Sequence, residues 1–106
     1  MKPPIIVNEH GDVSFFASVA AAAAYLEPVD VRNGEYVVYD SSGSVLQVVP
    51  ADPHVLILES PSDASDASGL LNVLRSFWQA ASREAAPHCS LQELIQRSVQ
   101  RFGYVQ

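Results

Sequence analysis

The sequence predicts an α+β protein made of one domain, residues 1–106, in which a mostly antiparallel sheet of about five strands is combined with three helices. Two observations support this prediction. Up to residue 59, short runs rich in β-branched and aromatic residues alternate with turn residues, as is typical of strands. After residue 69, apolar residues recur at helical spacing. The predicted order is β-β-α-β-β-β-α-α. Because strands that are adjacent in sequence tend to pair, we expect a mostly antiparallel sheet, and we expect the helices to cover one of its faces.

Residues 5–7 and 13–16 are predicted to form a first hairpin, because turn residues 8–12 separate two runs of strand-forming side chains. Ser18 is a suitable N-cap for a helix over 19–27, although Ala21 at the third helical position leaves a capping box incomplete. Pro28 disfavours helical geometry at Glu27, so this helix is expected to end there.

The segment 33–49 predicts a second hairpin, with strands over 35–39 and 45–49. Asp40-Ser41-Ser42-Gly43 suits a type I turn in which Gly43 takes a left-handed conformation and forms a bulge, which would pair Tyr39 with Val45. One face of the hairpin is then apolar and carries Tyr36, Val38, Leu46 and Val48. The opposite face is mixed, can meet water or a partner, and carries Glu35, Val37, Tyr39, Val45 and Gln47.

A further strand is predicted over 54–59, after two prolines within 50–53 break the chain. Its nearly unbroken apolar run indicates burial on both faces, hence a central position or cover from helices. Residues 60–68 form a polar connector with a candidate N-cap at Ser60-Pro61-Ser62-Asp63. Gly69 disfavours a single helix through this whole region.

Two amphipathic helices are predicted in the C-terminal part of the chain. Over 70–85 a broad apolar stripe follows one face, and Phe77 and Trp78 are adjacent, so only one of them is expected at its centre. Ser90-Leu91-Gln92-Glu93 is a capping box, so the last helix is expected to begin after Ser90 and to stop at Gly103.

Charge is unevenly distributed along the chain. The formal net charge is −6, and ten of the 12 acidic residues lie within 1–66, where Lys2 and Arg32 are the only lysine and arginine. Such an acidic surface disfavours nucleic acid as a partner and attracts a basic protein surface, while plain solubility is the alternative explanation. The single cysteine excludes an internal disulfide, and the apolar stretch 15–26 is too short to span a bilayer. We therefore expect a cytoplasmic protein that binds neither nucleic acid nor membrane.

Catalytic and metal-binding patterns are not evident. Cys89 follows His88, but adjacent residues at a helix start do not face each other, and Cys89 suits a hydrophobic staple with Leu94. Glu35 and Asp40 point to opposite faces of one strand, which makes them a poor acid–base pair. The spacing of a metal site is also missing among the candidate ligands His10, His54, His88 and Cys89. We therefore expect no enzymatic activity, no cofactor and no metal.

One segment resembles a known family. It comprises YLEPVDV at 25–31, NGEY at 33–36 and YDSSGSVL at 39–46. This YLEPxDVxxGEYxxYDxxGxxL pattern resembles small acidic bacterial immunity proteins of polymorphic toxin systems, and the likeness covers roughly residues 13–48. The resemblance implies an antitoxin that neutralises a cognate toxin domain by direct stoichiometric binding, and it brings no catalytic motif with it.

We expect such a partner to have a basic surface and to be bound through a charged patch around one aromatic anchor. The predicted patch consists of Asp12, Glu27, Asp30, Glu35, Tyr39 and Asp40. For Tyr39 the alternative is a structural cross-strand contact with Val45. For the whole chain the alternative is a non-catalytic interaction or oligomerising module that uses the mixed hairpin face or the helix with Phe77 and Trp78. The sequence leaves the oligomeric state and the activity of the toxin open.

Overall fold

The computed structural model describes residues 1–61 and 64–106, and it confirms the α+β class. Five strands lie in antiparallel pairs, and the described residues form four helices rather than the three that were predicted. The elements in chain order are β1 (Ile5–Glu9), β2 (Asp12–Phe16), α1 (Val19–Tyr25), α2 (Pro28–Arg32), β3 (Val37–Tyr39), β4 (Gln47–Ala51), β5 (His54–Leu58), α3 (Ala67–Ser82) and α4 (Leu91–Phe102). None of the helices in the described ranges is long and apolar enough to cross a membrane.

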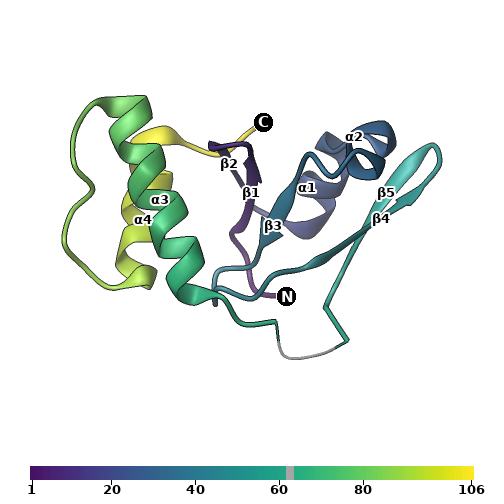
Figure 1. The fold of residues 1–106 in the computed structure, drawn as a ribbon, viewed down its shortest axis with the longest axis horizontal. Helices are drawn as coiled ribbons and strands as arrows, with labels where there is room; N and C mark the ends of the chain where they lie inside the picture. Colours follow the sequence, from purple (N-terminus) through teal and green to yellow (C-terminus); the bar gives the residue numbers. More distant parts are fainter. Residues whose placement is uncertain (62–63) are drawn as a thin grey trace.

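A three-stranded sheet of order β2-β1-β3 occupies the middle of the molecule (Figure 1). The predicted first hairpin is confirmed, with Ile5 opposite Phe16 and Glu9 opposite Asp12. On its other side β1 pairs with β3, which places Ile6 opposite Tyr39. Because β1 is the central strand, its first three residues are almost completely buried.

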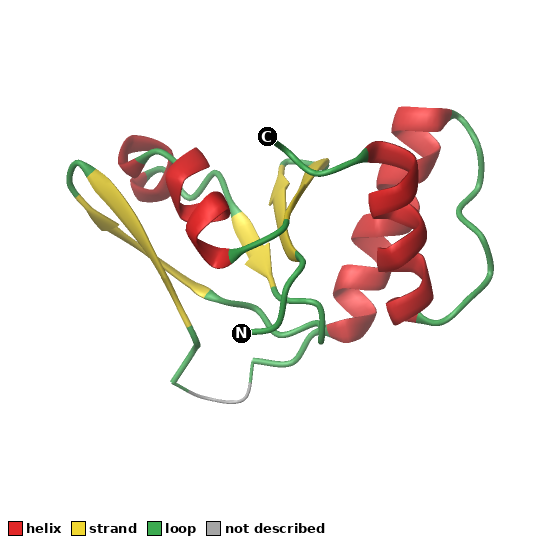
Figure 2. Ribbon diagram, turned by 180° about the vertical axis from the view of Figure 1, so that it is seen from behind, coloured by secondary structure: helices red, strands yellow, loops and turns green. Residues whose placement is uncertain are grey.

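Alternate side chains of this sheet enter two different hydrophobic clusters. Ile6, Phe15 and Tyr39 pack with α3 and α4 in what we call the helical core. Ile5 and Val38 face the other way, toward α1 and the β4–β5 pair, in what we call the ribbon core. The expectation that helices cover one face of the sheet was therefore wrong. Figure 2 shows α3 and α4 at one end of the long axis and α1 and α2 toward the other.

The second hairpin forms at its turn but not along its length. Gly43 has φ of 90°, and Tyr39 bridges Val45 as predicted. The Leu46 amide donates to the Val38 carbonyl at 2.8 Å, and beyond this bond β4 leaves β3 to pair with β5 in a separate two-stranded sheet. The predicted apolar face is nevertheless retained, because all four of its members contribute to the ribbon core: Tyr36, Val38, Leu46 and Val48.

The β4–β5 pair, here called the ribbon, corrects two expectations. Pro50 does not break the chain but lies within β4, opposite Val55, and the turn falls at Asp52-Pro53 instead. The strand over 54–58 is not buried on both faces: Val55 and Ile57 are buried, whereas Leu56 and Leu58 are 50% and 44% exposed. A continuous apolar run indicates a strand but does not show how many of its faces are covered.

The first helix is shorter than predicted, and a second short helix follows it directly. The Ser18 hydroxyl accepts a hydrogen bond from the Ala21 amide, as an N-cap should, and α1 ends at Tyr25. Pro28 then occupies the first turn of α2. Proline disfavours a helix that arrives from its N-terminal side but fits the first position of a new one, so one residue both separates α1 from α2 and starts α2.

The starts of α3 and α4 depend on side-chain caps. Asp66 caps α3 by accepting from the Gly69 amide, and a side chain at Gly69 would collide with the Asp66 carboxylate, which explains a glycine in the first turn. The N-cap expected at 60–63 partly lies outside the described residues. In α4 the Ser90 hydroxyl accepts from the Glu93 amide at 3.2 Å, and the helix ends at Gly103, both as predicted.

Candidate partner-binding surface

Carboxylates from three elements gather at one end of the central sheet. This surface, here called the acidic end, consists of Glu9, Asp12, Glu27, Asp30 and Glu35. Glu9 and Asp12 are cross-strand neighbours beside the β1–β2 turn. Glu27 and Asp30 lie at the start of α2, and Glu35 lies just before β3, which pairs with β1. In Figure 1 the β1–β2 turn and α2 both lie on the upper side of the molecule.

Hydrogen bonds tie these elements together. His10 Nε2 lies 2.7 Å from Glu35 Oε2, which joins the β1–β2 turn to the start of β3. The Tyr36 hydroxyl donates to Asp30 Oδ2 at 3.1 Å, and the Glu35 amide donates to the Asp30 carbonyl at 3.0 Å. The segments that carry Asp30 and Glu35 are therefore held together by contacts within the acidic end.

Four of the six predicted patch residues belong to the acidic end. Asp12 and Glu27 are exposed, and Asp30 and Glu35 are half-buried. Glu9 was not among the predicted patch residues. The signal that could have identified it is register, because the hairpin over 5–16 places Glu9 directly opposite Asp12.

Tyr36 has its pKa raised to about 12, first by burial of its ring and then by the hydrogen bond to Asp30. An unperturbed tyrosine titrates near pH 10, so folding favours the protonated phenol. We expect the free energy of unfolding to fall as pH rises from about 10 to about 12, and Tyr36→Phe to remove part of this decline. Denaturant unfolding of the wild type and of Tyr36→Phe at a series of alkaline pH values measures this decline. An equal decline in the two proteins would contradict the assignment of the pKa shift to Tyr36.

Tyr39 and Asp40 lie at the opposite end of β3 and are not part of the acidic end. Tyr39 is 5% exposed and packs in the helical core, so its cross-strand contact with Val45 describes it better than a surface anchor does. Asp40 is 6% exposed. The expected patch around one aromatic residue is corrected accordingly: the carboxylates gather, but the tyrosine is interior.

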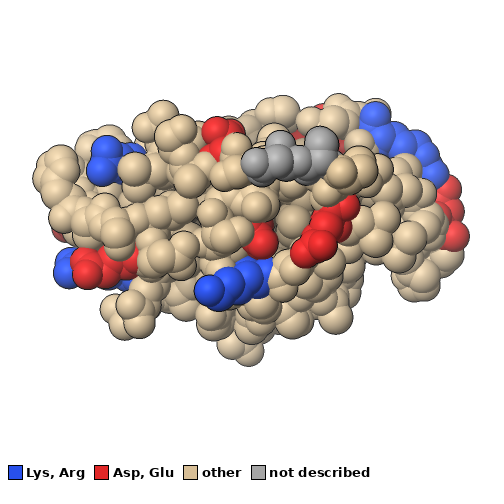
Figure 3. Space-filling model, turned by 90° about the horizontal axis from the view of Figure 1, so that it is seen from below, with Lys and Arg blue, Asp and Glu red and all other residues tan. Residues whose placement is uncertain are grey.

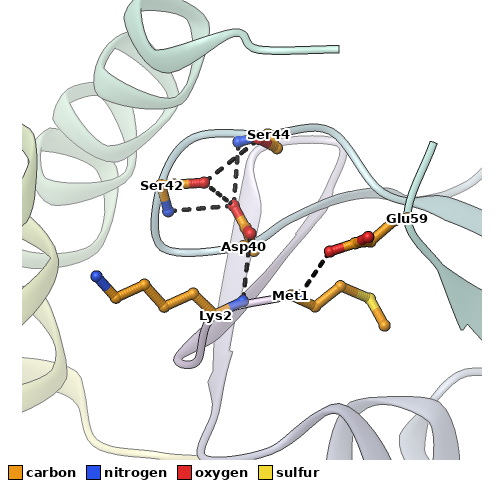
Figure 4. Close-up of polar contacts among 6 residues, drawn as sticks. All are labelled: Met1, Lys2, Asp40, Ser42, Ser44 and Glu59. Atoms are coloured by element: carbon orange, nitrogen blue, oxygen red, sulfur yellow. Dashed lines mark hydrogen bonds and ion pairs between the residues drawn. The ribbon is translucent and has the colours of Figure 1, made fainter. Parts of the chain in front are cut away.

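Asp40 organises the hairpin turn (Figure 4). Its Oδ1 accepts from the Ser42 hydroxyl at 2.6 Å and from the Ser42 and Ser44 amides at 3.1 Å each, while Oδ2 accepts from the Lys2 amide at 3.3 Å. Burial alone would raise the pKa of Asp40, but these hydrogen bonds outweigh burial and hold its pKa below the usual value. Its role is therefore structural, because four donors converge on a carboxylate that partners cannot reach.

The face around the N-terminus has a different character. Seen from below the view of Figure 1, it is mostly uncharged, and acidic and basic side chains are scattered singly or in small groups (Figure 3). The Met1 ammonium lies 2.8 Å from Glu59 Oε1 on this part of the surface. The face seen in Figure 3 therefore does not gather charges of one sign over a large area.

Exposed apolar side chains lie in two places relevant to binding. Val29 and Val37, 54% and 41% exposed, accompany the carboxylates of the acidic end. Leu56 and Leu58 are on the outer face of the ribbon. An apolar centre within a polar or charged rim is the usual composition of a protein–protein interface, and the first pair has this setting.

The Cys89 thiol is hydrogen-bonded to the backbone rather than to His88. Cys89 packs against the helical core, and its thiol donates to the Pro87 carbonyl at 3.6 Å, while His88 is exposed. Within the described ranges, no group of three or more histidine, cysteine, aspartate or glutamate side chains is placed to hold a metal ion.

The fold and this surface together define a small α+β protein with a charged, partly apolar surface at one end of its central sheet. Comparisons with protein-family models, with curated proteins and with solved structures find no match to this chain. What the chain binds is therefore inferred from its own residues and from the resemblance of residues 25–46 described above.

Proposed function

We propose that this chain is an immunity protein that neutralises a bacterial toxin domain by stoichiometric binding, with the acidic end facing a basic surface of the toxin. The observation that carries the proposal is the gathering of carboxylates from three separate elements at one end of the central sheet. The segment that resembles immunity proteins contributes Glu27, Asp30 and Glu35 to this surface. The resemblance and the charge cluster therefore point to the same place.

Charge explains how such a surface would act. A concentrated negative field accelerates encounter with a basic partner and disfavours partners of the same sign. Val29 and Val37 supply apolar area among the carboxylates, and desolvated apolar contacts in the centre of an interface slow dissociation. The protein would block the toxin by covering its active site or substrate-binding surface, which needs no catalysis by the antitoxin.

Co-expression with a candidate toxin domain tests the proposal. The wild-type chain is expected to restore growth, and the triple variant Asp12→Asn/Glu27→Gln/Glu35→Gln is expected to rescue poorly. Asp30 is left unchanged because it holds the Tyr36 hydroxyl.

A control variant removes the same number of charges elsewhere on the surface: Glu59→Gln/Glu84→Gln/Glu93→Gln, all exposed residues outside the acidic end. It should rescue like the wild type. If the wild type neither binds nor rescues, the antitoxin function is wrong. If both triple variants rescue fully, the acidic end is not the binding surface.

A second candidate function is self-association through β5, which keeps open the alternative of an oligomerising module. The observation in its favour is that β5 is an edge strand of the ribbon without acidic residues, lysine or arginine, and it exposes Leu56 and Leu58. An uncharged, apolar edge is suited to antiparallel pairing with a second copy. Sedimentation analysis would then show a dimer that Leu56→Lys dissociates; a wild type that remains monomeric at high concentration rules this function out.

A further inference from the structure

The divergence of β3 and β4 leaves a cleft beside the acidic end. The two strands are joined at the turn, where Tyr39 bridges Val45, and their last shared hydrogen bond runs from the Leu46 amide to the Val38 carbonyl. Beyond that bond the strands separate. The space between them has a volume of about 210 Å³ and is lined by Val31, Tyr36, Val37, Val38, Val45, Leu46 and Val48.

The cleft wall is apolar. Its lining side chains are aliphatic except for Tyr36, and the Tyr36 hydroxyl is already engaged with Asp30. The lining residues differ in depth: Val38 and Leu46 are buried, at 1% and 5% exposure, whereas Val37 is 41% exposed. The cleft therefore has a closed base and an accessible mouth, which suits one inserted apolar side chain.

Negative charge flanks this apolar wall. Asp30 immediately precedes Val31, and Glu35 immediately precedes Tyr36, so two lining segments each carry a carboxylate of the acidic end. Arg32 lies next to Val31, but its guanidinium is paired with the Asp52 carboxylate. Asp30 accepts from the Tyr36 hydroxyl through Oδ2 and Glu35 contacts His10 through Oε2, so each carboxylate keeps its other oxygen for a cation of the partner.

We propose that the cleft between β3 and β4 receives an apolar side chain of the partner that is flanked by arginine or lysine. The apolar group would enter between Val37 and Val48, and the flanking cations would meet Asp30 and Glu35. This inference rests on the proposed function, since it names the feature of a toxin surface that the acidic end would recognise. The combination of apolar anchor and opposite charge supplies both a slow dissociation and a fast association.

A synthetic peptide tests the cleft without the toxin. The probe is a five-residue peptide, blocked at both ends, with a central leucine between arginines; the matched peptide has serine in place of leucine. With methyl-labelled protein, the leucine peptide is expected to shift the NMR signals of the valines that line the cleft. The serine peptide is expected to shift signals of the acidic end but to leave those valine signals in place.

Variants separate the cleft from general charge attraction. Val37→Lys is expected to weaken binding of the leucine peptide about tenfold, the loss typical of an interface anchor. Asn33→Lys makes the same change of charge at the exposed end of α2, outside the lining of the cleft, and should weaken it much less. Equal losses in both variants, or equal effects of both peptides on the cleft signals, overturn the inference. If the leucine peptide binds in the cleft but the chain does not restore growth, only the antitoxin function is contradicted. If the chain restores growth but the leucine peptide does not shift the NMR signals of the cleft valines, only the proposed role of the cleft is contradicted.

Discussion

Replacing Phe15 with alanine is expected to lower the free energy of unfolding by about 3–5 kcal/mol. Phe15 is 1% exposed and lies where the central sheet meets the helical core, with its ring 6.3 Å from that of Phe77 in an edge-to-face arrangement. The substitution removes a large apolar surface and leaves a cavity between the central sheet and the helices α3 and α4. Because small domains are stable by only about 5–15 kcal/mol, this change removes a large part of the total.

Denaturant unfolding followed by tryptophan fluorescence measures this loss, since Trp78 lies in the same cluster. The control is Val29→Ala, which shortens an exposed side chain on α2 and should change the free energy of unfolding by no more than about 0.5 kcal/mol. A small effect of Phe15→Ala would mean that α3 and α4 are not packed on the sheet as described.

Replacing Asp40 with asparagine is expected to cost about 1–3 kcal/mol at neutral pH. The Ser42 and Ser44 groups bond Oδ1, which the asparagine oxygen can replace, but the Lys2 amide bonds Oδ2, where the asparagine nitrogen cannot accept. The substitution also removes the negative charge that strengthens all four hydrogen bonds. The same turn is linked to α4, because Gln92 Nε2 donates to the Ser41 carbonyl at 2.7 Å. The loss should therefore extend beyond the turn to the contact between the hairpin and the helical layer.

The cost of Asp40→Asn should depend on pH. The pKa of Asp40 is lowered in the folded protein, so the carboxylate contributes stability above its unfolded pKa of about 3.9. That contribution is lost as pH falls through the lower, folded pKa. Unfolding measured from neutral pH downward should show the two proteins converging in acid, whereas Asp12→Asn, an exposed control, should differ little from the wild type throughout. A difference between wild type and Asp40→Asn that is constant with pH would contradict a role for the charge.

Local features of the fold could be predicted from the sequence, because the residues that decide them are close together in the chain. Ser18 and Ser90 cap their helices, Gly103 ends α4, and Gly43 takes the left-handed conformation in the hairpin turn. In each case the cause is local: a serine hydroxyl accepts a hydrogen bond from an amide three residues further on, or a glycine without a Cβ adopts a positive φ. Caps and turns of this kind can be predicted from the sequence without knowing which residues pack around them.

Long-range features could not be predicted, because they depend on what each element meets. The turn at Asp40–Gly43 correctly pairs Tyr39 with Val45 but does not determine that β4 turns away after Leu46 and pairs with β5. Whether Leu56 is buried depends on which layers reach the ribbon, and its strand propensity carries no information about that. Pro28 was ambiguous for a related reason, since it can follow one helix and begin another.

The candidate surface was predicted in composition but not in shape. Asp12, Glu27, Asp30 and Glu35 were identified by charge, and the antiparallel pairing of β1 with both β2 and β3 brings their segments to one end of the sheet. Tyr39 was assigned to a surface because its strand face is mixed. The layer of α3 and α4 buries that face around Tyr39, and these helices are far along the chain.

The proposed binding is tested by the rate at which the purified chain associates with a candidate toxin domain as salt concentration is varied. Surface charges are screened within about 10 Å at 0.1 M salt, so steering by the acidic end should weaken steeply as salt increases. We expect fast, salt-sensitive association for the wild type and for Glu59→Gln/Glu84→Gln/Glu93→Gln. We expect slower and less salt-sensitive association for Asp12→Asn/Glu27→Gln/Glu35→Gln. A wild-type rate that does not change with salt, or equal rates for the two triple variants, would contradict binding through the acidic end.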